Sequence, residues 1–247
     1  VLYTNYERQV LGHFAGEFHD AWNSPLAWIE AEAIARRKGR TARAVAMRDT
    51  DCDLTSVVLV RKDGPIREIA DLRGKKIGVG ATDSPQATLL PLLPLTEAGL
   101  DPHRDSEVVF HDVLVGKHGD HIGGERDAAR ALMEGKIDAA CVLDANTLAF
   151  AREGTLPEGS TRVLAQTAPF DHCNFTVLDG APSELVARFT ELLFGMSYDD
   201  PQVRPLMDLE GLKAWKVGRT EGYAALARAC DKLDTLAHLL PEVFEAR

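Results

Sequence analysis

The sequence lacks the features that mark several common classes of protein. It has no apolar run of the roughly 18 residues that a membrane-spanning helix needs. It has no basic cluster with interleaved aromatic residues, and its net charge of −10 argues against nucleic acid or an anionic membrane surface as a partner. A Gly-rich nucleotide loop, a kinase signature and the Ser-His-Asp order are absent as well. These absences predict a protein with no membrane span and no nucleic-acid partner.

Cysteine is scarce, and its spacing argues against two familiar uses. The four cysteines form no CxxC pair, so neither a zinc ribbon nor a redox dithiol is indicated. Cys141 lies in the apolar run 137–143 and is predicted to be a buried core thiol. A single disulfide among the four is neither implied nor excluded by the spacing.

Apolar residues make up 45% of the chain and charged residues 27%, as in an ordinary soluble globular protein. Strand-like and helix-like segments alternate, which predicts an α/β fold with a parallel or mixed sheet flanked by helices. The predicted strands are 18–22, 41–47, 56–60, 75–79, 108–110, 137–142, 163–165 and 174–178. The predicted helices are 6–16, 24–38, 84–98, 126–133 and 144–152, and the remainder is expected to be mainly helical.

Residues 70–86 carry the most information. They predict a short helix, a tight turn at Gly74, a buried strand 76–79 and a loop of small residues. Ser84 before Pro85 predicts the start of a helix, because the Ser hydroxyl caps free N–H groups and Pro fits the first helical position. Such a unit leaves N–H donors facing open space and therefore predicts a site for an anionic ligand. The alternative is an ordinary βα unit of any α/β protein.

Polar segments follow five of the predicted strands, at the ends where open α/β sheets bind their ligands. Several of these segments also begin helices, so we expect their N–H groups and side chains to meet around one ligand. The five segments are 22–24, 81–84, 111–125, 144–146 and 169–173.

Four groups of residues resemble a known family. They are Thr4-Asn5-Tyr6 with 20–25; 56–63; 69–75 with Ser84, Pro85, Gln86 and Pro91; and Gly124-Glu125 with 135–139 and 169–171. In these residues the chain resembles the phosphate-, phosphite- and phosphonate-binding branch of the type 2 periplasmic substrate-binding proteins of ABC transporters. The resemblance extends from Tyr3 to about Tyr223.

The resemblance implies an α/β fold of two lobes joined by crossing strands, with a central ligand cleft. Lobe one is expected to comprise residues 1–62 and 174–247, and lobe two residues 63–173. The implied function is a non-enzymatic solute receptor of an ABC importer, periplasmic or attached to the cell surface, with a small polar molecule and an ABC permease as partners. No cofactor is expected. The family begins with a further strand and helix, so either the sequence is incomplete or lobe one is trimmed.

The resemblance and the strand ends together predict the ligand contacts. In lobe one these are Tyr6, Trp22, Asn23 and Ser24, and in lobe two they are Asp83, Ser84, Gln86, Glu125, Asp144 and Asp171.

Departures from the family pattern bear on the ligand. Only Ser84 fits the family's Ser/Thr-rich helix start, Glu125 stands where a His is common, and Leu54 replaces an aromatic residue. A carboxylate in place of His disfavours a bare dianion, because each uncompensated like charge costs on the order of 1 kcal/mol or more. We therefore expect a phosphonate-like zwitterionic or other amine-bearing ligand in preference to free phosphate. Its ammonium group would lie near Glu125, Asp144 or Asp171.

A second hypothesis is a metal-dependent enzyme on the same scaffold, located in the cytoplasm. Its candidate ligands are His118, His121 and Glu125 from a His-rich segment, with Asp171, His172 and Cys173 across the same cleft. Imidazole, carboxylate and thiolate groups bind zinc or ferrous iron, and three of them with an open position support hydrolytic or oxygen chemistry. The spacing is not HExxH, and ligand-contact or surface histidines are the alternative.

Some of these residues also have structural interpretations. Trp28 is predicted to lie in the core, and Trp215 and Tyr223 to be structural. Asp144 and Asn146 are residue types that favour helix N-caps, so capping is an alternative to ligand contact.

Overall fold

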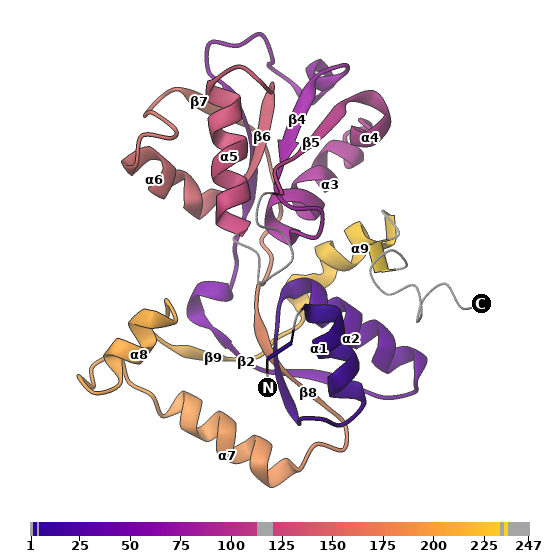
Figure 1. The fold of residues 1–247 in the computed structure, drawn as a ribbon, viewed down its shortest axis with the longest axis vertical. Helices are drawn as coiled ribbons and strands as arrows, with labels where there is room; N and C mark the ends of the chain where they lie inside the picture. The colour runs from indigo at the N-terminus through magenta and orange to yellow at the C-terminus, as the bar shows by residue number, and fades with distance from the viewer. Residues whose placement is uncertain (1, 4, 113–120, 233–234, 237–247) are drawn as a thin grey trace. The chain divides into compact units, whose positions relative to one another are not determined.

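Two units make up the chain in the computed structural model, which describes residues 2–3, 5–112, 121–232 and 235–236 (Figure 1). Unit 1 comprises residues 1–53 and 170–247, and unit 2 comprises residues 54–169. Both units combine helices with a sheet, as the alternation of segments predicted. Strand β3 (Ser56–Arg61) belongs to unit 2, because both of its ladder partners lie there. The sequence-based division had assigned this strand to lobe one.

Unit 2 contains a mixed five-stranded sheet in the order β5-β4-β6-β3-β7. β4 is parallel to β5 and β6, whereas β3 is antiparallel to β6 and β7. The strand bounds are Lys76–Val79 for β4, Glu107–Phe110 for β5, Ala139–Leu143 for β6 and Thr161–Gln166 for β7. The helices are η2 (Ile69–Leu72), η3 (Pro85–Leu89), α3 (Leu90–Glu97), α4 (Pro102–Asp105), α5 (His121–Met133) and α6 (Asp144–Arg152).

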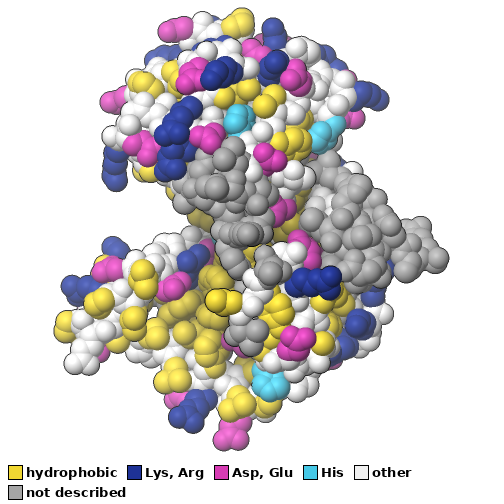
Figure 2. Space-filling view, in the orientation of Figure 1, with side chains coloured by type: hydrophobic (Ala, Val, Ile, Leu, Met, Phe, Trp, Pro, Cys, Tyr) yellow, Lys and Arg dark blue, Asp and Glu magenta, His cyan; other side chains and the backbone are white. Residues whose placement is uncertain are grey.

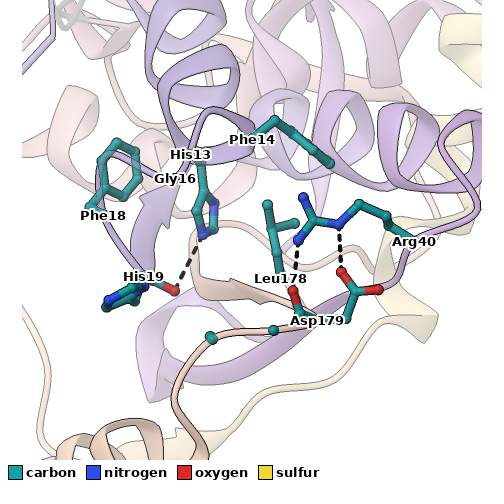
Figure 3. Close-up of a pocket in the computed structure, with 10 residues that line it drawn as sticks. His13, Phe14, Gly16, Phe18, His19, Arg40, Leu178 and Asp179 are labelled. Carbon is teal, nitrogen blue, oxygen red and sulfur yellow. Dashed lines mark hydrogen bonds and ion pairs between the residues drawn. The ribbon is translucent and has the colours of Figure 1, made fainter.

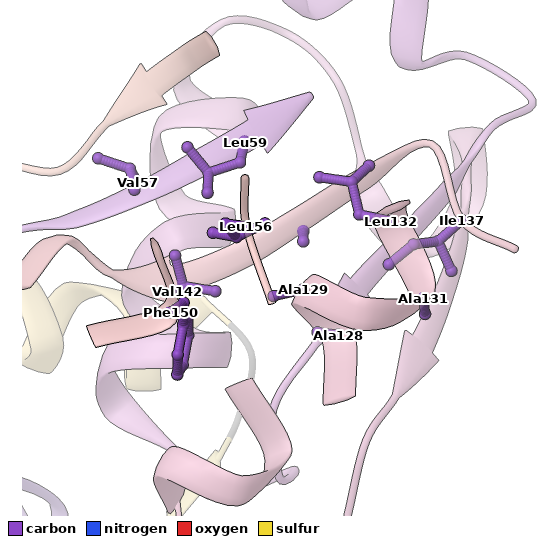
Figure 4. Close-up of a cluster of buried hydrophobic side chains, with 11 residues drawn as sticks. Val57, Leu59, Ala128, Ala129, Ala131, Leu132, Ile137, Val142, Phe150 and Leu156 are labelled. Atoms are coloured by element: carbon purple, nitrogen blue, oxygen red, sulfur yellow. The ribbon is translucent and has the colours of Figure 1, made fainter. Parts of the chain in front are cut away.

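The unit 2 sheet is buried on both faces, which explains its continuous apolar strands. Val57 and Leu59 of β3 pack with α5 and α6 in one core cluster (Figure 4). Val58 and Val60 point to the opposite face and pack with residues of α3. Cys141 is fully buried in that second cluster, as predicted. The four cysteines, all in the described part of the chain, are free thiols.

Unit 1 contains an antiparallel sheet in the order β1-β8-β2-β9. The strand bounds are Asp20–Asn23 for β1, Ala42–Arg48 for β2, Asn174–Leu178 for β8 and Trp215–Val217 for β9. The helices are α1 (Tyr6–Phe14), α2 (Pro25–Arg37), η1 (Asp49–Asp51), α7 (Ser183–Phe194), α8 (Arg204–Leu209), η4 (Glu221–Tyr223) and α9 (Ala224–Lys232). The sequence did not predict β9, because three residues carry too little pattern to identify a strand.

The two faces of the unit 1 sheet have different chemistry. On one face the ring of Trp22 lies 4.7 Å from that of Phe175, which in turn lies 4.9 Å from Phe189 of α7. On the other face Trp28 of α2 lies 5.7 Å from Tyr223, and both are nearly fully buried. Trp28 is therefore a core residue, as predicted.

Apolar side chains also remain exposed on unit 1. They gather around α7, α8 and β9, where Figure 2 shows a group of hydrophobic atoms. The members are Leu185, Leu192, Phe194, Leu206, Leu209 and Val217. No helix in the described part of the chain is both long and apolar enough to cross a bilayer.

Candidate functional site

Three strand ends meet at one edge of the unit 2 sheet. β4 lies between β5 and β6 and is parallel to both, so their carboxyl ends are adjacent. A Cβ atom added at Gly124 in α5 would overlap the carbonyl oxygen of His111 and lie 3.6 Å from the Cα atom of Gly80. Only glycine permits so close an approach of backbones. The start of α5 therefore packs directly against the loops that follow β4 and β5.

Glu125 joins this helix to the third strand end. Its side chain is fully buried, and its Oε2 atom accepts hydrogen bonds from the Leu143 N–H at 2.7 Å and from Asn146 Nδ2 at 2.9 Å. Asn146 therefore bonds to Glu125, and α6 begins without a side-chain cap. The carboxylate of Glu125 lies at the carboxyl end of β6, among the other strand ends.

Ser84 begins the helical segment after β4. Its Oγ atom accepts the Ala87 N–H at 3.2 Å, which confirms the predicted cap. The first turn, Pro85–Leu89, is a π-helix that continues into α3. Such local widening of a helix is frequent at functional sites.

The same loop holds polar groups without partners in the described part of the chain. The N–H groups of Thr82, Asp83 and Gln86 donate to no described residue. Asp83 Oδ1 and Gln86 Oε1 are buried and accept from none. Gln86 is only 5% exposed. Buried polar groups are normally hydrogen-bonded, so this loop has the free donors and acceptors that a small polar ligand would satisfy.

Asp144 lies at the same edge of unit 2. It is half-buried, its N–H donates to the Thr55 carbonyl at 2.9 Å, and its Oδ2 atom is 3.5 Å from Thr55 Oγ1. Among the described residues, its carboxylate therefore has only this weak hydrogen bond. The structure places five predicted contacts at this edge, namely Asp83, Ser84, Gln86, Glu125 and Asp144.

In unit 1 a chain of side-chain hydrogen bonds runs through the core. Its members, in order, are Gln9, Asn23, Thr176, Asn174, Tyr223 and the carbonyl of His172, at successive distances of 2.9, 2.9, 2.6, 2.9 and 2.7 Å. Asn23, Thr176 and Asn174 have no exposed surface. The predicted contact Asn23 therefore ties β1 to β8 with its amide bonded at both ends.

Tyr6, Asn23 and Ser24 lie in one part of unit 1. Tyr6 is the first residue of α1, whose N-terminus is capped by the side chain of Asn5. One turn further, Gln9 bonds to Asn23 at the end of β1. Ser24 caps the following helix, α2, as predicted. The N-termini of helices α1 and α2 therefore lie close together.

Trp22 points away from this group. It alternates with Asn23 along β1 and so faces the opposite side of the sheet. Its ring is half-buried, and the guanidinium carbon of Arg48 lies 5.0 Å from the ring centroid. The described contacts of the Trp22 ring are thus aromatic packing and a cation–π interaction.

Asp171, which the sequence assigned to lobe two, belongs to unit 1. Its carboxylate is buried and binds Arg219 in a bidentate manner, with Nε to Oδ2 at 2.7 Å and Nη2 to Oδ1 at 2.6 Å. The N–H of Asp53 donates to the same carboxylate at 3.1 Å. Arg219 therefore neutralises the charge of Asp171 within unit 1. Its partner lies 48 residues away, and no sequence pattern indicated the pair.

The candidate ligands of the metal hypothesis belong to different units of the chain. His118 and the side chain of His121 lie outside the described residues, and Glu125 belongs to unit 2. His172 and Cys173 belong to unit 1, where they lie beside Asp51, which the sequence analysis did not include. Burial disfavours the imidazolium, but the facing Cys173 and Asp51 outweigh it and raise the pKa of His172 to about 10.

A cavity of about 190 Å³ in unit 1 is lined by residues other than the predicted contacts (Figure 3). Its lining is His13, Phe14, Gly16, Phe18, His19, Arg40, Leu178, Asp179, Gly180 and Ala181. Arg40 is already bound to Asp179, with Nε to Oδ1 at 2.7 Å. Burial lowers the pKa of His13, so that side chain favours its neutral form. Among the lining residues, the guanidinium of Arg40 is therefore already paired.

The polar network of unit 1 contains residues that the sequence analysis missed. Gln9, Arg219 and Asp51 were not predicted to contact the candidate residues, since their partners are distant in the sequence or on other elements. A weak signal was available in β8, where Asn174 and Thr176 alternate with apolar residues in a core strand. Inward polar residues of this kind normally have bonded partners.

Comparison with known proteins agrees with this geometry. The family described as "ABC transporter, phosphonate, periplasmic substrate-binding protein" matches residues 1–223. No curated protein sequence matches the chain significantly.

Solved structures share the fold at low sequence identity. A Prochlorococcus marinus PhnD1 in complex with methylphosphonate aligns with a TM-score of 0.68 and 14% identity, covering 95% of this chain and 84% of that one. A binding protein component of an ABC phosphonate transporter from Pseudomonas aeruginosa aligns with a TM-score of 0.59 and 12% identity, covering 98% and 86%. The Escherichia coli aliphatic sulphonate-binding protein SsuA aligns with a TM-score of 0.58 and 19% identity, covering 98% and 82%.

The family match spans most of the chain, and the two α/β units have the fold of these binding proteins. The expectation drawn from the sequence is confirmed: the chain belongs to the periplasmic substrate-binding proteins of phosphonate ABC transporters.

Proposed function

We propose that this protein is a receptor for a small phosphonate-like zwitterion and that the loop 82–86 of unit 2 binds the ligand's charged groups. The observation that carries the proposal is the set of unsatisfied polar groups in this loop, at the edge where β4, β5 and β6 end. Periplasmic location and delivery to an ABC permease follow from the family and are part of the proposal. The family gives no support to the metal-dependent enzyme.

The acidic group of the ligand is assigned to the backbone donors. The N–H groups of Thr82, Asp83 and Gln86 are free among the described residues, and Gln86 lies in the first turn of a helical segment that begins at Pro85 and runs to Glu97. A helix N-terminus combines free N–H groups with a partial positive charge, which favours an anion.

The amine of the ligand is assigned to the unsatisfied acceptors of the same loop. Asp83 Oδ1 and Gln86 Oε1 each lack a donor in the described structure. The weakly bonded carboxylate of Asp144 lies at the same edge of the sheet. Asp171, by contrast, is already neutralised by Arg219 and is not needed as an ammonium partner. An ammonium group close to the acidic group satisfies these acceptors, whereas a bare phosphate leaves them unpaired.

Calorimetric titration with 2-aminoethylphosphonate, methylphosphonate and phosphate tests the proposal. We expect 2-aminoethylphosphonate to bind most tightly. Asp83→Asn and Gln86→Leu should each weaken its binding about 10- to 100-fold, because the first removes the negative charge that faces the ammonium group and the second removes an acceptor for it. Methylphosphonate has no amine, so Asp83→Asn should change its affinity much less.

One substitution in the same unit serves as a control. Asp63→Asn removes an exposed carboxylate that follows β3, and β3 is antiparallel to β6, so Asp63 lies towards the opposite edge of the sheet. It should leave affinity unchanged. Equal binding of phosphate and 2-aminoethylphosphonate, or a loss in Asp63→Asn equal to that in Asp83→Asn, would overturn the assignment.

A further inference from the structure

Three metal-binding side chains converge in unit 1. They are Asp51 of η1 and the consecutive residues His172 and Cys173, and their ligand atoms all lie within 4.8 Å of one another. His172 Nδ1 is 3.2 Å from Cys173 Sγ and 3.3 Å from Asp51 Oδ1. Tetrahedral zinc, with bonds of about 2.0–2.3 Å, places its donors about 3.3–3.6 Å apart. The imidazole therefore has close to the required separation from both other donors.

Hydrogen bonds fix the backbone and the carboxylate of this cluster. The N–H of His172 donates to the Asp51 carbonyl at 2.8 Å, and the His172 carbonyl accepts the Tyr223 hydroxyl at 2.7 Å. Arg48 Nε donates to Asp51 Oδ2 at 2.5 Å. Oδ1, which faces the imidazole, is bonded more weakly to Arg48 Nη2, at 3.1 Å. An outer partner that orients a ligating carboxylate in this way is typical of protein metal sites.

Burial also suits a bound cation. Asp51 is 2% exposed and Cys173 is 6% exposed, while the His172 side chain retains 22% exposure. A metal ion can therefore reach the cluster from solvent on the side of the imidazole. A thiolate, an imidazole and a carboxylate form a mixed donor set that favours zinc over magnesium or calcium.

We propose that Asp51, His172 and Cys173 form a binding site for zinc, which takes the place of the proton held by the His172 imidazole, with water in the fourth position. This site differs from the metal centre considered from the sequence, since it uses Asp51 and no residue of unit 2. It is also independent of the phosphonate-binding proposal, whose residues all belong to unit 2.

Titration of the reduced, chelator-treated full chain with cobalt(II), as a spectroscopic substitute for zinc, tests the site. We expect one equivalent to produce a near-ultraviolet thiolate-to-cobalt charge-transfer band and intense visible bands typical of four-coordination, and zinc to abolish both. Cys173→Ser should remove the charge-transfer band. His172→Ala should weaken binding at least about 100-fold, because even the loss of an outer partner of a ligand typically costs about 10- to 100-fold. Cys52→Ser is the matched control and should behave like the unaltered protein, because Cys52 is outside the cluster.

X-ray absorption of the zinc-loaded unaltered protein gives a second readout that does not depend on the folding of a variant. One sulfur at about 2.3 Å with nitrogen and oxygen neighbours is expected. Absence of stoichiometric binding, a zinc shell without sulfur, or a charge-transfer band that persists in Cys173→Ser and is lost in Cys52→Ser would each overturn the proposal.

Discussion

Arg219 binds the buried carboxylate of Asp171 through two hydrogen bonds, at 2.7 and 2.6 Å. Asp171 has no exposed side-chain surface, whereas Arg219 retains 40%. The same guanidinium also binds Asp53, at 2.7 Å. The pair thus fixes a buried charge next to the segment that contains His172 and Cys173.

Arg219→Ala should destabilise the protein by about 2–3 kcal/mol, because it leaves a buried carboxylate without its cation. The value is lower than for a fully buried pair, since Arg219 is partly solvated. Urea unfolding measures this change in the free energy of unfolding. Arg36→Ala, which breaks an exposed pair with Glu32, should cost less than about 0.5 kcal/mol. Equal losses in the free energy of unfolding of the two variants would show that the buried pair with Asp171 stabilises the protein no more than an exposed pair does.

Gly222 is predicted to tolerate no side chain. A Cβ atom there would overlap the Cγ and Oδ2 atoms of Asp171, so Gly222→Ala must displace the carboxylate from Arg219. We expect a loss of about 1–3 kcal/mol in the free energy of unfolding. In Gly64→Ala the added Cβ atom would lie 3.2 Å from its nearest atom, so this substitution should reduce the free energy of unfolding clearly less. A thermal unfolding midpoint for Gly222→Ala that equals that of the unaltered protein would contradict this packing.

The buried hydroxyl of Tyr223 connects two parts of the unit 1 network. It accepts from Asn174 and donates to the His172 carbonyl, so Tyr223→Phe leaves both groups without this partner. The expected cost is about 1–3 kcal/mol, measured by urea unfolding. Tyr198→Phe is the matched control, because the Tyr198 hydroxyl binds Asp208 at an exposed position. It should change stability by less than about 0.5 kcal/mol. Similar costs for the two variants would argue against the network.

Asp20 should make stability depend on pH. Burial raises the pKa of Asp20 to about 7, partly opposed by a hydrogen bond from the Ala21 N–H, and its Oδ1 atom has no partner in the described structure. The unfolded chain loses this proton near pH 4 and the folded chain only near pH 7, so the unfolded state binds fewer protons between these values. The contribution of Asp20 to stability therefore falls as pH rises from about 4 to 7 and is constant above that range.

Asp20→Asn removes this dependence. We expect little change at pH 4 and a stabilisation of at least about 2 kcal/mol at pH 8, measured by urea unfolding across the range. The exposed Asp63→Asn provides the reference curve. A difference between Asp20→Asn and the unaltered protein that does not grow with pH would show that Asp20 ionises normally in the folded state.

Local sequence signals identified most elements. Ser24 and Ser84 cap the helices that they were predicted to begin, and Gly39 and Gly74 have the positive φ angles that their turns require. Residues 144–152 and 174–178 have the bounds that were predicted. These features depend on neighbours in the chain, so a single sequence contains the information needed to predict them.

The pairing of strands was harder to predict from the sequence. The alternation of elements predicted a parallel or mixed sheet, which describes unit 2 but not the antiparallel sheet of unit 1. β8 lies between β1 and β2 although it is distant from both in the sequence. Strand order of this kind depends on long-range pairing and leaves no mark on local periodicity.

The family, the two-part α/β character and the strand-end positions of Asp83, Ser84, Gln86, Glu125 and Asp144 were predictable from the amino-acid sequence alone. Caps, turns and apolar periods are local, and the physics that produces them acts within a few residues. The ion pair of Arg219 with Asp171, and the grouping of Asp51 with His172 and Cys173, became evident from the folded chain. These partners are brought together by packing of distant segments, because the charge and hydrogen bonds of a buried group must be satisfied by whatever the fold places beside it.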